Sequence, residues 1–242
     1  MVRIVRALNE VTKLTGERPV VVGGLAVLCR LTQPHRATTD LDVVERPEAG
    51  QERVLEVLRR APGAHPEEPA AVWIPTASGP VRVDVLEVNP AEIDIPSDDP
   101  GDRLHATSHS WALESATSLS VSARATRRGA EVLASPQMAE PGPLVAMKLQ
   151  AIDNRSGDKQ GTDLLDIVRL TLDPVTGRTA IAQLRSVYLS MALDVDRHVE
   201  RWFEAKRSWS LSRIHAVGGT AVVDDDLAVV HDLLRTAVRR TC

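Results

Sequence analysis

The sequence has few aromatic residues, only two cysteines and no long apolar run. Four tryptophans, one tyrosine and one phenylalanine are too few for a platform that stacks single-stranded bases, so we expect Trp202, Phe203 and Trp209 to pack between helices. Cys29 and Cys242 form neither a disulfide framework nor a metal-ligand spacing, which suggests a reduced, cytoplasmic setting. The opening MVRIVRALNE lacks the apolar core of a signal peptide, and no later segment is apolar enough to cross a bilayer, so we expect no membrane partner.

The rest of the composition is that of an ordinary globular chain. With 242 residues and 43% hydrophobic content, it can bury a sizeable core as one body or as two small lobes. The formal net charge of −4 argues against a globally basic nucleic-acid binder, although local basic clusters remain compatible with phosphate binding. The charge therefore leaves the partner open.

Residues 1–140 alternate predicted helices and strands. Apolar residues from Ile4 to Leu14 recur at helical spacing, and Gly16 follows as a stop signal. Further segments have the length and pattern of short helices or β-branched strands. We expect helices at 25–31 and 51–60, and strands at 18–22, 41–45, 70–75, 81–88, 117–123 and 131–136. By contrast, the segment 89–110 is rich in Pro, Asp, Ser and Gly, which predicts a mobile loop outside the fold.

The step Pro141-Gly142-Pro143 marks the clearest change of character along the chain. Beyond it the apolar spacing is helical throughout, and we expect helices at 144–152, 162–172, 180–205 and 224–240. We therefore predict an α/β (α+β) fold, with a mixed sheet and flanking helices over 1–140 and a helical C-terminal lobe over 141–242.

Three aspartates are the first candidates for chemistry. Asp40 and Asp42 lie two residues apart at the start of a predicted strand, so they share one face while Leu41 points into the core. Asp84 stands between Val83 and Val85 in another apolar strand, where a lone charge needs a partner. If the two strands are neighbours, three carboxylates meet, and such oxygen ligands suit Mg²⁺ or Mn²⁺ bound together with substrate phosphates.

A glycine pair precedes these aspartates. Gly23 and Gly24 lie between a predicted strand and a predicted helix, where glycine lets the backbone approach a ligand and the helix N-terminus offers unpaired N–H groups to phosphate. Arg36, Thr38 and Thr39 could add further phosphate contacts. The segment therefore has the parts of a nucleotide-phosphate site.

Each of these motifs also has an ordinary explanation. A Gly-Gly step after a strand is commonly a simple turn, and an Asp-x-Asp at a strand edge is commonly a solvated surface. The order and spacing of the motifs, together with a third aspartate in an apolar strand, favour the functional interpretation. His105 and His109 are also four residues apart, but they stand in the predicted loop without a third ligand, so we expect no metal there.

The segment GGLAV…RATTDLDVV, with VDVL farther along, resembles the metal-site signature of the DNA-polymerase-β-type nucleotidyltransferases. Downstream, LVAMKLQAIDNRSGDKQGTDLLDIVRL resembles the helical region of the AbiEii/AbiGii toxins, a branch that includes the MenT-type toxins. The resemblance implies a minimal nucleotidyltransferase fold and metal-dependent transfer of NMP from an NTP. For this branch it also implies a toxin that acts on the 3′ end of tRNA or a similar RNA acceptor, with a cognate antitoxin as a possible partner.

The resemblance also assigns roles to individual residues. Asp40 and Asp42 would ligate both metals, while Asp84 would share one metal and help to deprotonate the attacking hydroxyl. Lys148 would reach the triphosphate as a point charge. Arg155, Lys159 and Asp163 match the later motif, although the branch usually has Lys and Asp adjacent where this chain has KQGTD. This difference leaves open whether Lys159 pairs with Asp163 or contacts the acceptor, and a solvated helix start capped by an aspartate explains these three residues equally well.

Two further hypotheses fit the sequence. The segment GGLAV…QPHRATTDLDVV is also similar to the aminoglycoside nucleotidyltransferases, although Leu25 and Leu28 stand where those enzymes tend to have Trp and Asp. A non-catalytic descendant that binds a nucleotide or a protein partner is the third hypothesis. The sequence leaves open which NTP and which acceptor are used.

Overall fold

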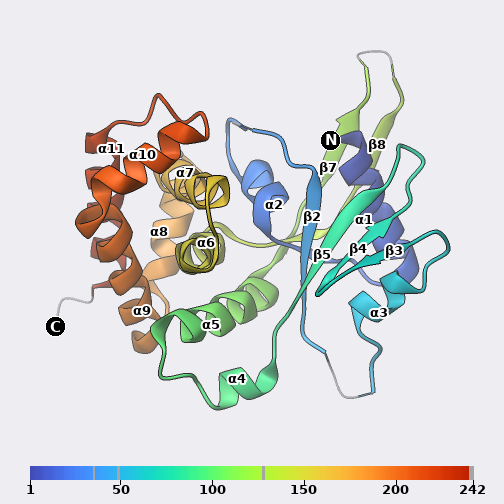
Figure 1. The fold of residues 1–242 in the computed structure, drawn as a ribbon, viewed down its shortest axis with the longest axis horizontal. Helices are drawn as coiled ribbons and strands as arrows, with labels where there is room; N and C mark the ends of the chain where they lie inside the picture. The colour runs from blue at the N-terminus through green and yellow to red at the C-terminus, as the bar shows by residue number, and fades with distance from the viewer. Residues whose placement is uncertain (35, 48–49, 127–128, 240–242) are drawn as a thin grey trace. The chain divides into compact units, whose positions relative to one another are not determined.

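The computed structural model describes residues 1–34, 36–47, 50–126 and 129–239 (Figure 1). The chain divides into two compact units, and one of the boundaries between them falls within helix α5 (Pro100–Ser115). The first unit comprises Met1–Cys29, Gln33–Pro90 and Ser110–Glu140, and the second comprises Arg30–Thr32, Ala91–His109 and Pro141–Cys242. The long segment of the second unit thus begins at Pro141, where the sequence predicts a boundary, but two earlier segments are grouped with it.

The first unit is built on a mixed β-sheet. Its strand order is β3-β4-β5-β2-β1-β9-β6, and a separate hairpin pairs β7 with β8. The strands are β1 (Val20–Val21), β2 (Asp40–Glu45), β3 (His65–Glu67), β4 (Ala71–Ile74), β5 (Val81–Glu87), β6 (Thr117–Ser118), β7 (Val121–Arg124), β8 (Glu131–Ala134) and β9 (Gln137–Met138). Strand β2 is parallel to β5 and β1 is parallel to β9, whereas β1 and β2 are antiparallel and β4 is antiparallel to β3 and β5. The mixed α/β class predicted from the sequence is therefore confirmed.

Helix α1 (Val2–Thr15) contacts strands β2 and β5 and helix α3 (Val54–Arg59). Its buried residues recur at helical spacing, as the sequence predicts. Gly16 ends the helix in the left-handed region at φ 77°, and its N–H donates to the carbonyl of Thr12 at 2.9 Å. This is the common way in which a glycine satisfies a terminal carbonyl.

The second unit is helical. It contains α6 (Pro141–Asn154), α7 (Asp158–Leu172), α8 (Thr176–Arg185), α9 (Leu189–Glu200), a π-helical turn at Arg201–Ala205, α10 (Arg207–Ala216) and α11 (Asp224–Val238). The prediction of one helix over 180–205 is wrong, because α8 ends at Arg185 and α9 begins at Leu189. Trp202 and Phe203 are buried and Trp209 stacks on Trp202 with ring centroids 5.5 Å apart, so the predicted packing role is confirmed.

The prediction of a mobile loop over 89–110 is also wrong. The segment contains α4 (Pro90–Asp94) and most of α5. Asp99 caps α5, because its Oδ1 accepts hydrogen bonds from the N–H groups of Gly101 at 2.7 Å and Asp102 at 3.0 Å. Arg103 then forms a two-point ion pair with the buried carboxylate of Asp194 at 2.6 and 2.7 Å. The polar composition of this segment led to the prediction of a loop, although its polar residues cap α5 and anchor it by an ion pair.

Other differences are local. Helix α2 (Gly23–Arg30) begins at the glycine pair rather than after it, and strand β1 is shorter than predicted. Strands β3 and β9 have no counterpart in the prediction. Cys242 lies outside the described residues. Among the helices that the structure describes, none combines the length and the apolar character needed to cross a membrane.

Candidate functional site

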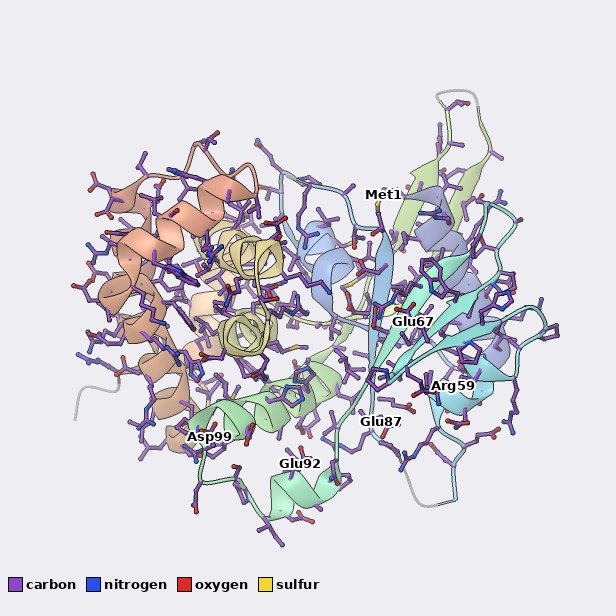
Figure 2. All side chains as sticks on the ribbon, in the orientation of Figure 1. Met1, Arg59, Glu67, Glu87, Glu92 and Asp99 are labelled. Carbon is purple, nitrogen blue, oxygen red and sulfur yellow. The ribbon has the colours of Figure 1, made fainter. Side chains whose placement is uncertain are left out.

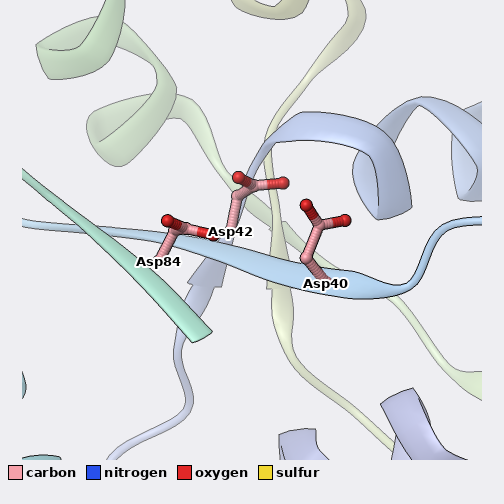
Figure 3. A group of neighbouring side chains, drawn as sticks. All are labelled: Asp40, Asp42 and Asp84. Atoms are coloured by element: carbon pink, nitrogen blue, oxygen red, sulfur yellow. The ribbon is translucent and has the colours of Figure 1, made fainter. Parts of the chain in front are cut away.

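The parallel pairing of β2 with β5 brings the three predicted aspartates together. Asp42 lies opposite Asp84 in the register of the two strands. Each of Asp40, Asp42 and Asp84 offers a carboxylate oxygen within 4.8 Å of those of the other two. Figure 3 shows the three side chains on the same face, with Asp40 and Asp42 on β2 and Asp84 on β5. The condition that the sequence left open, that the two strands are neighbours, is therefore met.

The burial of these strands explains why the carboxylates face one way. In β2, Leu41 and Val43 are buried while Asp40 and Asp42 are half-buried, so the period-two alternation puts apolar residues on one face and carboxylates on the other. Strand β5 alternates in the same way around Asp84.

The donor set fits a hard divalent cation. Three carboxylate oxygens close together repel one another unless a cation lies near them, and Mg²⁺ and Mn²⁺ prefer such oxygen ligands. The side chain of Asp84 is 21% exposed, so the site remains accessible to solvent. Among the described residues, no other group of His, Cys, Asp or Glu has this geometry.

A cationic side chain also lies at this cluster. The guanidinium of Arg82, two residues before Asp84 on the same strand face, forms an ion pair with the Asp84 carboxylate. Its Nε also lies 3.2 Å from the carboxylate of Glu67. Burial works against the charge on Arg82, but the carboxylates of Asp84 and Glu67 outweigh it, so the pKa of Arg82 is raised.

Position 23 requires a glycine because its backbone lies directly against Asp42. It has φ 62°, a conformation that side-chain-bearing residues rarely adopt, and a Cβ atom at this position would overlap the carboxyl group of Asp42. The start of helix α2 therefore lies directly against one of the three aspartates. The neighbouring Gly24 is also confined, since a Cβ there would lie 3.0 Å from Nη2 of Arg36 and 3.1 Å from Oγ1 of Thr38.

The structure brings Arg36 and Thr38 to this first turn of α2. It also shows a contact of Thr38 that the sequence did not predict, a hydrogen bond to Asp40. The hydroxyl of Thr38 is buried and donates to Oδ1 of Asp40 at 2.8 Å. Thr38 therefore orients one carboxylate of the group formed by Asp40, Asp42 and Asp84, which we call the carboxylate triad. Thr39 is exposed.

In the second unit, Lys148 and Asp163 form a buried ionic cluster. Nζ of Lys148, on α6, lies 2.5 Å from the carboxylate of Asp163 and 2.8 Å from that of Asp166, both on α7. All three residues are at most 6% exposed. Burial opposes the charge on Lys148, but the two carboxylates outweigh it and its pKa is raised. A triphosphate would therefore compete with two buried carboxylates for the Lys148 ammonium.

The two other predicted residues of this region differ. Arg155 lies 3.0 Å from the carboxylate of Asp163 and joins the ionic cluster at its exposed side. Lys159 is exposed, and the described residues include no ion pair between it and Asp163. A capping role for Asp163 is wrong, because its carboxylate is buried within α7 and pairs with Lys148.

The histidine pair lies on α5, not in a loop. The rings of His105 and His109 are 4.1 Å apart, and Nδ1 of His109 lies 2.7 Å from the carbonyl of His105. Burial, with a smaller effect of the neighbouring His105, lowers the pKa of His109 to about 4. His109 is therefore a neutral core residue at physiological pH.

Sequence reasoning missed three members of these clusters. Arg82 and Asp166 had a visible signal, because Arg82 shares the period-two face of Asp84, and Asp166 follows Asp163 by three residues on a helix. Glu67 had none, because its strand β3 has no apolar pattern.

No protein-family profile matches the sequence, and no curated protein matches it either. Among solved structures, the fold is similar to that of an antigenic nucleotidyltransferase-like protein from Paracoccidioides brasiliensis, with a TM-score of 0.47 and 17% sequence identity over 88% of this chain and 92% of that chain. At this TM-score and identity, the similarity assigns neither a family nor an activity, and the functional argument depends on the site itself.

Proposed function

We propose that this protein is a metal-dependent nucleotidyltransferase that transfers NMP from an NTP to an acceptor hydroxyl and releases pyrophosphate. The observation that carries the proposal is the convergence of three carboxylates on two adjacent parallel strands, with the glycine-containing start of α2 against one of them. A second cluster of carboxylates with this geometry does not occur among the described residues.

In this proposal the three aspartates and Thr38 have different roles. Asp40 and Asp42 would hold two divalent cations and Asp84 would share one of them, and Thr38 keeps the carboxylate of Asp40 in place. When bound, the cations supply the positive charge that offsets charge developing on the phosphate oxygens. The bond between the acceptor oxygen and the α-phosphorus forms as the bond to the pyrophosphate oxygen breaks, and the Asp84 carboxylate helps to take up the hydroxyl proton.

The phosphates would lie at the first turn of α2. Gly23 and Gly24 form the first turn of this helix, and the unpaired N–H groups of a helix N-terminus favour anions. Arg36 adds a guanidinium at Gly24, and the exposed Thr39 adds a hydroxyl. We propose that Arg155 and Lys159, which are exposed cations, contact the acceptor.

For the finer activity we propose a toxin that modifies the 3′ end of tRNA and is restrained by a cognate antitoxin. This rests on the resemblance of residues 144–170 to the AbiEii/AbiGii branch, together with the ionic pairing of Lys148, Asp163 and Arg155. An aminoglycoside acceptor and a non-catalytic binding function are the alternatives that the experiment must separate.

The test is a transfer assay with each of the four NTPs labelled at the α-phosphate. The full chain is incubated with Mg²⁺ or Mn²⁺ and with total tRNA, an aminoglycoside panel or no acceptor. We expect label on RNA, with none from Asp42→Asn and full transfer by Asp94→Asn, a matched change at an exposed residue of α4. Label on an aminoglycoside instead of RNA would show that the acceptor is the drug and not tRNA. Absence of label with every acceptor and both metals would overturn the transferase proposal.

A further inference from the structure

A cationic side chain, that of Arg82, lies next to the carboxylate triad and pairs with Asp84. Two rows of residues cross the sheet on the face of the triad, as the strand registers show. One row contains Glu67, Ala71, Asp84 and Asp42, and the next contains His65, Trp73, Arg82 and Asp40. Residues in register share a face, so the guanidinium of Arg82 lies among the carboxylates rather than on the opposite side of the sheet.

The arginine is shared between two acids on either side of a small residue. Ala71 separates Glu67 from Asp84 in the first row, and the guanidinium reaches past it to both carboxylates. It forms an ion pair with Asp84, and its Nε lies 3.2 Å from Glu67.

Glu67 is itself anchored at the edge of the sheet. Its carboxylate accepts a hydrogen bond from Nε1 of Trp73 at 2.6 Å, and strand β3, which carries Glu67 (Figure 2), is the outermost strand beside β4. This carboxylate is therefore a second, fixed binding position for the guanidinium that is separate from the triad.

We propose that Arg82 is a built-in counter-cation of the triad, which occupies Asp84 before a divalent cation binds and pairs with Glu67 alone afterwards. The inference rests on the proposed metal site. A divalent cation and a guanidinium compete for the same carboxylate, so Arg82 weakens metal binding and limits the repulsion among the aspartates when no metal is bound. Glu67 opposes this competition, because it holds the guanidinium in the position that leaves Asp84 to the metal.

The sign of the effect distinguishes this role from a purely structural one. Removing the charge of Arg82 should tighten metal binding, because Coulomb's law gives about a tenfold change for a unit charge roughly 6 Å from a divalent ion in water. Structural damage at the site would instead weaken binding. Removing the charge of Glu67 should weaken binding several-fold, and most of this effect should disappear when Arg82 is also replaced.

The experiment measures Mn²⁺ binding to the full chain by titration calorimetry and by the electron paramagnetic resonance of free Mn²⁺, without NTP. The variants are Arg82→Gln, Arg82→Lys, Glu67→Gln and the double variant. Arg53→Gln is the matched control, because it removes an ion pair of 3.3 Å to Glu87 on the same strand without touching the triad. Circular dichroism checks that each variant is folded, and Arg82→Lys keeps the charge if the neutral variant does not fold.

We expect tighter binding by Arg82→Gln, near wild-type binding by Arg82→Lys and Arg53→Gln, and weaker binding by Glu67→Gln that depends on Arg82. Unchanged or weaker binding by a folded Arg82→Gln overturns the counter-cation role, and transfer activity in the wild type would then leave the proposed function intact. If neither the wild type nor Arg82→Gln binds Mn²⁺, the metal site is absent and both proposals fall.

Discussion

Asp42 and Asp84 lie directly opposite each other on the parallel strands β2 and β5, although 42 positions separate them in the sequence. Two like charges opposite each other destabilise a sheet, and Asp40 adds a third carboxylate to the group. Such an arrangement costs stability, and the ion pair of Arg82 with Asp84 offsets part of this cost. The concentration of like charge at one place on the sheet is the reason to interpret the cluster as functional.

The first prediction concerns the charge of Asp42. Because Asp42→Asn removes one of three mutually repelling carboxylates, we expect the metal-free protein to unfold at the same temperature as the wild type or higher. Mn²⁺ should raise the unfolding temperature of the wild type, since a ligand that binds only the folded state stabilises it. It should not raise that of the variant. Thermal unfolding with and without Mn²⁺ measures both effects, and an equal Mn²⁺ shift in the two proteins would contradict the metal site.

The second prediction compares two glycines with the same backbone strain. Gly23→Ala and Gly16→Ala each place an alanine at positive φ, near 62° and 77°, which costs about 1 kcal/mol. Only at Gly23 does the added Cβ meet another group, the carboxyl group of Asp42. We expect a loss of unfolding free energy of about 1 kcal/mol for Gly16→Ala and a larger loss for Gly23→Ala, together with loss of Mn²⁺ binding. Urea unfolding and Mn²⁺ titration test this, and equal losses without an effect on Mn²⁺ would contradict it.

The third prediction concerns the buried ion pairs of Lys148. Lys148→Met removes the buried ammonium that pairs with Asp163 and Asp166, and breaking such buried pairs costs about 3–5 kcal/mol. Lys159→Met, at an exposed position of the same unit, should change the unfolding free energy by less than about 0.5 kcal/mol.

Chemical unfolding of both variants gives the comparison for Lys148. If Lys148→Met unfolds like the wild type but requires much more NTP, the ammonium contacts the triphosphate and the ion pairs contribute little. If it is destabilised and also loses transfer activity, the double variant with Asp166→Asn should restore part of the stability, because it removes one of the two buried negative charges that Lys148 pairs with.

The fourth prediction is a pH dependence caused by His109. Its pKa is about 4 in the folded protein and near 6.5 in an unfolded chain. Between these values the unfolded chain binds a proton that the folded protein excludes, so stability falls as the pH decreases from about 6.5 to about 4. The contribution reaches as much as about 3 kcal/mol at the acid end. His109→Gln should therefore have a flatter stability profile over this range than the wild type, measured by urea unfolding at each pH, and parallel profiles would contradict the assignment.

The local elements followed from short patterns in the sequence. Apolar spacing and Gly16 predict α1, and β-branched runs predict β2 and β5 as well as the side of each strand that carries an aspartate. These properties depend on residues within a few positions of one another, so they can be recognised without knowledge of the rest of the chain. The candidate metal ligands belong to this class, because period-two alternation makes Asp40 and Asp42 neighbours in any sheet.

Long-range pairing was not contained in those patterns. Apolar strands of similar length can pair in many registers, and only burial on the folded sheet selects the one in which Asp84 faces Asp42 and Arg82 faces Asp40. Likewise, a lysine on a helix has the same local pattern whether it is solvated or buried, and packing of α6 against α7 decided that Lys148 pairs with two aspartates. Residue type and spacing supplied the chemical groups, whereas the competition for burial decided which groups meet.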